Sequence, residues 1–152
     1  MTKLDIRDVK SEDFDIWLPL WDGYNAFYGR AGATALPRHI TDVTWKRFFD
    51  PAEPVHALVA DDGQQLLGLV HYLFHRSTIM IAPICYLQDL FTIEAARGKG
   101  VGLALIEAVY ARARAAGTTR VYWQTQATNA TARKLYDQVA QLSGFLVYRK
   151  DV

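Results

Sequence analysis

Apolar and polar residues alternate along several short stretches of this 152-residue chain, which is the pattern of half-buried β-strands. Residues 83–93 differ because they are mostly apolar, as expected of a central strand that is covered on both faces. Between two other stretches, Asp61, Asp62 and Gly63 form a turn signal, so those two are predicted to pair as a hairpin. The predicted strands are residues 4–9, 55–60, 65–76, 83–93, 120–125 and 145–149.

Helical spacing fills most segments between these strands. In the first helix, Trp17, Trp21, Tyr24 and Tyr28 recur every three or four residues and share one face, which we expect to pack into the core. Strands and helices interleave without a linker or a repeat. The chain is therefore predicted to form one α/β domain over residues 1–152, with a mixed central sheet flanked by helices. The predicted helices are residues 11–28, 41–49, 100–116 and 129–142.

Composition narrows the class of protein. Hydrophobic residues make up 51% of the chain and charged residues 22%, as in ordinary globular domains. The 17 basic and 16 acidic residues nearly cancel, which argues against a general nucleic-acid-binding role. No apolar run is long enough to span a membrane, and the first ten residues lack the apolar core of a signal peptide. We expect a cytoplasmic protein that binds neither membranes nor nucleic acid, with its single cysteine, Cys85, buried.

The sequence RGKGVG at residues 97–102 joins the apolar strand to the alanine-rich third helix. The first amides of a helix have no partner within it, and glycines let a ligand approach them closely. Together with the helix dipole, the cations Arg97 and Lys99 suit this turn to a phosphate or pyrophosphate. No Ser or Thr follows the lysine as in a P-loop, and residue 103 does not complete the dinucleotide motif G-x-G-x-x-G. A turn without a ligand is the alternative.

The turn and its surroundings resemble the acetyl-CoA motif R-x-x-G-x-G of the GCN5-related N-acetyltransferases. The segment VYWQTQATNATARKLYD, residues 121–137, is similar to the strand, loop and helix that follow this motif in the family. The segment CYLQDLFTIEAARGKGVG, residues 85–102, is similar to diamine acetyltransferases and to the yeast histone and polyamine acetyltransferases. The resemblance extends over residues 4–149 and is strongest over residues 86–136, and it implies the fold of that family.

By this resemblance, acetyl-CoA is the co-substrate and lies where two central parallel strands, residues 86–93 and 120–125, separate. Strand backbone pairs with the pantetheine arm, an amide near Phe91 polarises the thioester carbonyl, and Tyr136 protonates the leaving thiolate. Asn129 lies two helical turns before Tyr136 and either contacts the cofactor or caps its helix. The implied cofactor-binding residues are Leu90, Phe91, Thr92, Arg97, Gly98, Lys99, Gly100, Val101, Gly102 and Asn129.

The general base and the acceptor site follow less directly. Diamine acetyltransferases carry a glutamate where this chain has Gln88, which cannot accept a proton. Asp89 is the candidate catalytic carboxylate, with a structural hydrogen-bond acceptor as its alternative role, and successive strand residues are expected to face opposite sides. The acceptor pocket of the family is built from the first two helices, so Trp21, Asp22 and Tyr24 are candidates for its wall.

We therefore predict an N-acetyltransferase that acts on the primary amine of a polyamine-like small molecule or, second, of a peptide or protein. A non-catalytic acyl-CoA-binding or sensor domain on the same fold is the alternative, and an ATP-binding protein is a further one. His71 and His75 share a strand face but lack a third ligand, so no metal site is expected. A single terminal strand, residues 145–149, would leave a sheet edge to cover, and a homodimer that pairs or exchanges this strand is expected from the resemblance.

Overall fold

A five-stranded sheet forms the centre of the computed structural model, which describes residues 3–152. The strands lie in chain order, so each strand pairs with its neighbours in sequence. The first four run antiparallel, whereas the fifth is parallel to the fourth. The strands are β1 (Asp5–Asp8), β2 (Val55–Asp61), β3 (Leu66–His75), β4 (Ile84–Thr92) and β5 (Val121–Tyr122).

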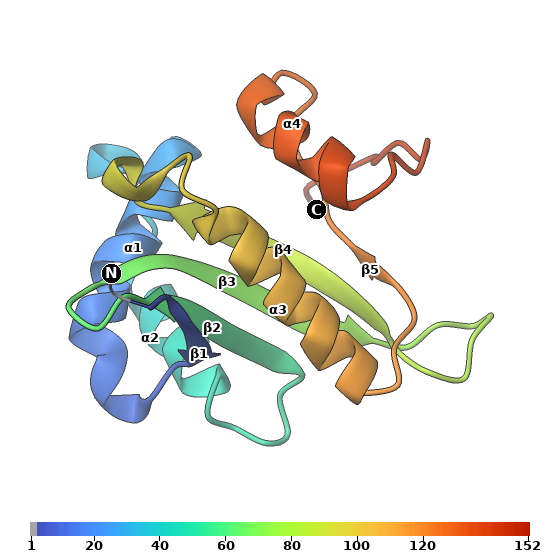
Figure 1. The fold of residues 1–152 in the computed structure, drawn as a ribbon, viewed down its shortest axis with the longest axis horizontal. Helices are drawn as coiled ribbons and strands as arrows, with labels where there is room; N and C mark the ends of the chain where they lie inside the picture. Colours follow the sequence, from blue (N-terminus) through green and yellow to red (C-terminus); the bar gives the residue numbers. More distant parts are fainter. Residues whose placement is uncertain (1–2) are drawn as a thin grey trace.

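Helices cover both faces of the sheet (Figure 1). α3 (Val101–Ala115) lies on one face and connects β4 to β5, because parallel strands need a crossover connection. α1 (Phe14–Phe27) and α2 (Arg38–Arg47) pack on the opposite face. α4 (Ala130–Val139) follows β5. Within residues 3–152, no helix combines the length and apolar character that crossing a membrane requires.

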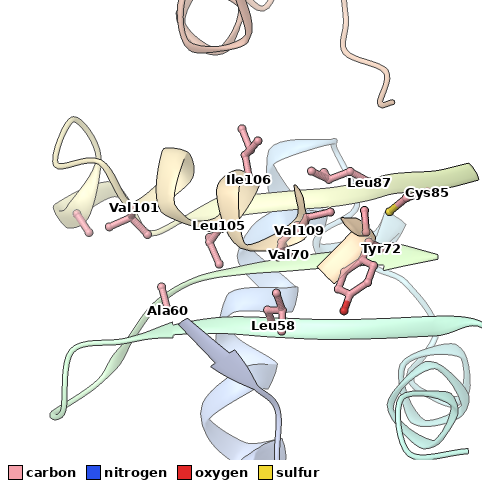
Figure 2. Close-up of a cluster of buried hydrophobic side chains, with 12 residues drawn as sticks. Leu58, Ala60, Val70, Tyr72, Cys85, Leu87, Val101, Leu105, Ile106 and Val109 are labelled. Atoms are coloured by element: carbon pink, nitrogen blue, oxygen red, sulfur yellow. The ribbon is translucent and has the colours of Figure 1, made fainter. Parts of the chain in front are cut away.

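The core on the α3 face is mostly aliphatic (Figure 2). Val101, Leu105 and Val109 lie four residues apart on α3 and so face the sheet together, where they pack in one cluster with Val70. Each fully buried aliphatic side chain contributes roughly 1.5–3 kcal/mol. Cys85 joins this core as predicted, and burial raises the pKa of its thiol to about 11, so it remains an unreactive thiol at neutral pH.

Gly68 in β3 lets α3 and β4 approach closely. A Cβ at Gly68 would lie 3.1 Å from Cδ1 of Leu105, 3.2 Å from Cγ1 of Val101 and 2.7 Å from the carbonyl oxygen of Phe91. A larger residue would push α3 away or loosen β3 from β4. Since Phe91 precedes the glycine-rich turn and Val101 lies within it, Gly68 helps to set the position of that turn.

The core on the α1 face is aromatic, which confirms the packing face predicted for the first helix. Trp17, Trp21 and Tyr24 are buried, and their successive rings stack with centroids 5.8 Å and 5.4 Å apart. Trp45 of α2 packs 4.8 Å from Trp17, so the two helices share this layer. Aromatic pairs contribute about 0.5–1.5 kcal/mol beyond the area that they bury. Tyr28, the last member of the face, is 36% exposed and lies at the rim.

The predicted terminal strand is wrong. Residues 145–149 form no strand, and the sheet ends at β5. Phe145, Leu146 and Tyr148 are 88%, 80% and 92% exposed. A strand forms only against a neighbour that accepts and donates its backbone hydrogen bonds, and the described chain places none beside this segment.

Two further boundaries differ from the prediction. The fifth strand covers only Val121–Tyr122 instead of residues 120–125, because β4 and β5 stop pairing there. The second helix starts at Arg38 rather than at residue 41. The extra turn follows Pro37, and an exposed ion pair at 2.9 Å joins Arg38 to Asp42 one turn later. Because this turn is stabilised by exposed polar residues, the apolar pattern of the sequence did not predict it.

Candidate functional site

β4 and β5 separate shortly after they meet. The two parallel strands pair only at Cys85 with Val121 and at Tyr86 with Tyr122. β4 then continues to Thr92, bonded to β3 on one side and to no strand of residues 3–152 on the other. The predicted separation of the two central parallel strands is confirmed. It leaves backbone N–H and C=O groups of β4 available to an extended ligand.

The alternation of β4 identifies which of its residues face this opening. The N–H of Ile93 donates to the carbonyl oxygen of Leu67 in β3 at 2.9 Å. Because backbone groups of an antiparallel strand point alternately to either side, Phe91 also faces β3, and Leu90 and Thr92 face the opening. The N–H of Phe91 itself is therefore directed at β3. The nearby amides that face the opening, and so are candidates for the predicted contact with a carbonyl, are those of Leu90 and Thr92.

A β-bulge accompanies the separation. Asp89 pairs with His71 of β3 but Leu87 pairs with Tyr72, so Gln88 is an extra residue of β4. Leu87 belongs to the core on the α3 face, whereas Asp89 lies on the α1 face beside His71. Simple alternation would have put these two side chains on the same face. No sequence signal marks the extra residue, which is exposed.

The glycine-rich turn presents unpaired amides at the end of β4. None of the backbone N–H groups of residues 98–103 donates a hydrogen bond to another described residue. Gly98 and Gly100 adopt φ angles of +76° and +83°, which side chains rarely allow. The amides that begin the 15-residue α3 also carry its partial positive charge. Together these groups form a site suited to an anion.

Two cations flank this anion site. The Nε of Arg97 donates to the carbonyl oxygen of Thr92 at 3.2 Å, and its guanidinium lies 5.8 Å from the centroid of the Phe91 ring. Arg97 thus ties the turn back to the end of β4. Lys99 is exposed, so its charge is available to a ligand.

α4 completes the site from the other side. A Cβ at Gly102 would lie 3.3 Å from Cδ2 of Leu135 in α4 and 3.9 Å from Oγ1 of Thr92. The turn, the end of β4 and α4 therefore meet at Gly102. Next to Leu135, the ring of Tyr136 packs 5.4 Å from that of Trp123, and burial raises the pKa of the phenol above its usual value.

Asn129 occupies the N-cap position of α4, as one of the two predicted roles requires. Its side chain nevertheless makes no capping hydrogen bond to the helix. Instead, Nδ2 donates to Oγ1 of Thr125 at 3.2 Å, which anchors the side chain to the loop after β5. The cofactor contact predicted for Asn129 stays a prediction.

His71 and Asp89 form a buried polar pair beneath α1. Nδ1 of His71 lies 2.9 Å from Oδ2 of Asp89, and Nε1 of Trp17 lies 3.2 Å from Nε2 of His71. An indole N–H can only donate, so Nε2 accepts and the neutral ring carries its proton on Nδ1, which it donates to Asp89. This chain of hydrogen bonds ties α1 to β3 and β4. From the sequence, a hydrogen-bonded or exposed histidine was favoured over a metal ligand at His71, but its partners Trp17 and Asp89 were not predicted. Across residues 3–152, no group of three or more candidate ligand side chains could hold a metal ion.

Tyrosines surround the Asp89 carboxylate. Burial, followed by the charge of Asp89, raises the pKa of Tyr24 well above its usual value. Burial and the Asp89 charge also raise the pKa of Tyr28, and burial, Tyr122 and Asp89 raise that of Tyr86. These phenols are therefore protonated at neutral pH. Tyr28 and Tyr86 were missed, although the spacing of the aromatic face already placed Tyr28 next to Tyr24.

The three residues predicted to line the acceptor wall separate in the structure. Tyr24 lies beside Asp89. Trp21 is buried in the aromatic core, where its Nε1 donates to Oγ1 of Thr41 at 3.1 Å. Asp22 is exposed to solvent. Of the three, Tyr24 is the one that the contacts connect to the candidate site.

Comparison with known proteins agrees with this geometry. The model of the acetyltransferase (GNAT) family matches residues 17–140. The D-amino-acid N-acetyltransferase HPA3 of Saccharomyces cerevisiae is 34% identical over 148 residues, which cover 96% of this chain and 89% of the yeast protein. The uncharacterized N-acetyltransferase YhfO of Bacillus subtilis is 30% identical over 151 residues, which cover 95% of each protein.

Solved structures show the same fold at lower identity. The crystal structure of a probable acetyltransferase superposes with a TM-score of 0.83 at 23% identity and covers 97% of both chains. AAC(6')-Iy, in complex with a bisubstrate analogue of CoA and acetylneamine, superposes with a TM-score of 0.82 at 15% identity and covers 99% of both chains. At these identities the likeness concerns the fold alone.

The contacts of Asp89 predict an anchoring role that Asp89→Asn can test. The amide oxygen of asparagine can still accept from Nδ1 of His71, but a neutral acceptor forms a weaker hydrogen bond than a carboxylate. We expect the free energy of unfolding in denaturant to fall by about 1 kcal/mol. The pH profile of kcat/KM for the remaining acetyl transfer should match that of the wild type.

Asp42→Asn serves as the control, because Asp42 forms an exposed ion pair whose loss should cost little. Loss or displacement of the acid limb of the profile in Asp89→Asn, with stability unchanged, would instead make Asp89 the general base.

Proposed function

This chain belongs to the acetyltransferase (GNAT) family, and we propose that it transfers the acetyl group of acetyl-CoA to a primary amine of a small molecule. Its family and its named relatives make it an acetyl-CoA-dependent N-acetyltransferase. The kind of amine and the roles of individual residues are the proposal. The observation that carries it is the turn at residues 97–102, in which the amides of residues 98–102 donate to no described residue, at the end of the β4 edge that β5 leaves open.

The amides of residues 97–102 would hold the pyrophosphate of acetyl-CoA, with Arg97 and Lys99 adding charge. A run of unpaired amides at a helix start, opened by glycines at positive φ, fits a doubly charged anion. The free edge of β4 at Leu90 and Thr92 would pair with the amide groups of the pantetheine arm. Asn129, on the loop that begins α4, would contact the arm from the other side.

Acyl transfer needs a stabilised oxyanion and a proton for the leaving thiolate. The outward amide of β4 next to Phe91 would donate a hydrogen bond to the thioester oxygen as negative charge develops there. Tyr136 would donate a proton to the sulfur. Its raised pKa keeps the phenol protonated at neutral pH, so its O–H remains available to the sulfur while the carbon–sulfur bond breaks.

The acceptor amine must lose its own proton before it attacks. Alkyl ammonium groups have a pKa of about 10.4, so kcat/KM should rise with pH through the neutral range. The yeast relative is named as an N-acetyltransferase of D-amino acids. We therefore place amino acids beside polyamine-like amines as acceptors, and peptide amines after them.

A second copy of this chain is the proposed partner. Four consecutive apolar residues, 145–148, are exposed, and β5 has no neighbour on its outer edge among residues 3–152. Such a segment could add to the β5 edge of another copy and gain backbone hydrogen bonds there. A homodimer would cover both the apolar segment and the open edge.

An amine panel tests the activity and the acid together. With acetyl-CoA, wild-type protein should release the CoA thiol only when an amine acceptor is present. Tyr136→Phe keeps the ring and removes the proton, so kcat should fall about 10²–10⁴-fold while the Kd for acetyl-CoA stays the same. Tyr110→Phe is the matched control, because that phenol donates to the carbonyl oxygen of Val139 at 2.8 Å and should affect stability alone.

A Tyr136→Phe protein with wild-type kcat, where chemistry limits the rate, would remove the acid assignment. Acetyl-CoA binding without thiol release for any amine would favour the non-catalytic acyl-CoA-binding alternative.

Gly100→Ala tests the anion site. A Cβ at a φ of +83° is strained, so the turn must shift and its amides lose their common direction. We expect the Kd for acetyl-CoA, measured by calorimetry, to rise about tenfold, which corresponds to about 1.4 kcal/mol. Gly117→Ala is the control: Gly117 follows the other end of α3 with a φ of +78° and equally open surroundings. Equal effects of the two changes on affinity would move the pyrophosphate away from the turn.

Light scattering after size exclusion tests the dimer. Wild-type protein should elute with about twice the 17.2 kDa mass of one chain, and Leu146→Lys should shift it toward the monomer. Ile16→Lys changes a single exposed apolar residue of α1 and should leave the dimer intact. A monomeric wild type at micromolar concentration would refute the dimer.

A further inference from the structure

Arg30 is held in one orientation by α1, although it lies beyond the end of that helix. Its backbone N–H donates to the carbonyl oxygen of Asn25 at 2.9 Å, and its Nε donates to Oδ1 of Asn25 at 2.7 Å. Asn25 is itself 3% exposed, and its Nδ2 donates to the carbonyl oxygen of Trp21 at 2.9 Å. Because both polar atoms of the buried Asn25 side chain are hydrogen-bonded, Asn25 is fixed and limits the rotamers of Arg30. An ordinary surface arginine has no such restriction.

The guanidinium of Arg30 lies beside two tyrosine rings and keeps its outer face free. It is 5.9 Å from the centroid of Tyr24 and 5.7 Å from that of Tyr28, and these rings are 5.0 Å apart. Cation–π contacts of this kind stabilise its position. The Nε–H of Arg30 donates to Asn25, whereas its two terminal nitrogens donate to no described residue. A guanidinium stays charged and offers a planar pair of donors that matches a carboxylate.

The same tyrosines connect Arg30 to the surroundings of Asp89. Burial is the main cause of the raised pKa of Tyr28, the Asp89 carboxylate raises it further, and the Arg30 guanidinium lowers it. Tyr28 in turn contributes to the raised pKa of Tyr136. The cluster therefore has a negative and a positive group within electrostatic reach. It also lies next to β4, because Gly23 precedes Tyr24 on α1 and a Cβ at Gly23 would lie 2.8 Å from Cζ of Phe91. A polyamine, which is cationic along its length, would be repelled by Arg30.

We propose that Arg30 binds the carboxylate of the acceptor, so that the acceptor is an amino acid rather than a polyamine. This inference rests on the proposed acetyl transfer, because it names the substrate class of the same site. Asn25 and the two tyrosine rings hold the guanidinium in place before the acceptor arrives. Less side-chain freedom is then lost on binding, which favours affinity.

Three acceptors with the same side chain test the inference: an amino acid, its carboxamide, which is nearly the same size, and the smaller amine that lacks the carboxyl group. Both enantiomers of the amino acid are included. Wild-type kcat/KM for the better enantiomer should exceed that for each acceptor without a carboxylate at least about tenfold. The difference should lie mainly in KM, since charge-assisted hydrogen bonds are the stronger ones. Arg30→Gln keeps a polar planar end and removes the charge, so this ratio should fall to about one.

Arg38→Gln is the matched control. The Arg38 guanidinium also lies over an aromatic ring, 5.2 Å from Phe14, but it pairs with Asp42, and its loss should leave the ratio unchanged. The inference is overturned if the kcat/KM of the wild-type protein for the carboxamide and for the amine equals that for the amino acid. It is equally overturned if Arg30→Gln lowers kcat/KM for all three acceptors by the same factor, which indicates a structural role. Thiol release with none of the acceptors, while acetyl-CoA binds, would overturn the proposed function itself.

Discussion

The incomplete pairing of β4 with β5 is the constraint on which the whole site depends. A sheet satisfies its backbone only where strands stay about 4.8 Å apart, and these two do so for two residue pairs. Beyond Tyr86, Leu90 and Thr92 have no strand to bond on this side. Arg97 donates to the carbonyl oxygen of Thr92, and the remaining outward backbone groups need water or a ligand. The glycine-rich turn begins where this free edge ends, and α4 closes on the turn at Gly102. One departure from regular sheet structure thus creates the opening and positions the groups around it.

Packing on both faces holds the strands in this arrangement. On the α3 side, Gly68 brings the helix close to β3 and β4. On the α1 side, a Cβ at Gly23 would lie 2.8 Å from Cζ of Phe91, so the helix backbone rests directly on the ring. The buried pair of His71 and Asp89 adds direction to this contact, because its hydrogen bonds are satisfied in a single register of α1 over the sheet. Such a pair adds little net stability but is costly to break.

Charge is arranged locally in a chain that is almost neutral overall. Arg97 and Lys99 stand at the turn, at one end of the opening, where an anion would be held. Asp89 and Arg30 act on Tyr28 with opposite sign, at the proposed acceptor side. The net charge of +1 reveals neither feature, because a sum over the chain does not say where the charged residues lie.

The sequence by itself determined the features whose cause is local. The β2–β3 hairpin, the aromatic face of α1 and the turn at residues 97–102 follow from turn residues, helical periodicity and glycines that must take positive φ. The tertiary structure alone decided the bulge at Gln88 and the partnership of His71 with Asp89. Residues 145–149 show the same limit, since their run of apolar residues is typical of a strand but no neighbouring strand is present among the described residues. Each of these depends on a partner far along the chain or on another chain, and hydrophobic pattern contains no information about which segments will meet.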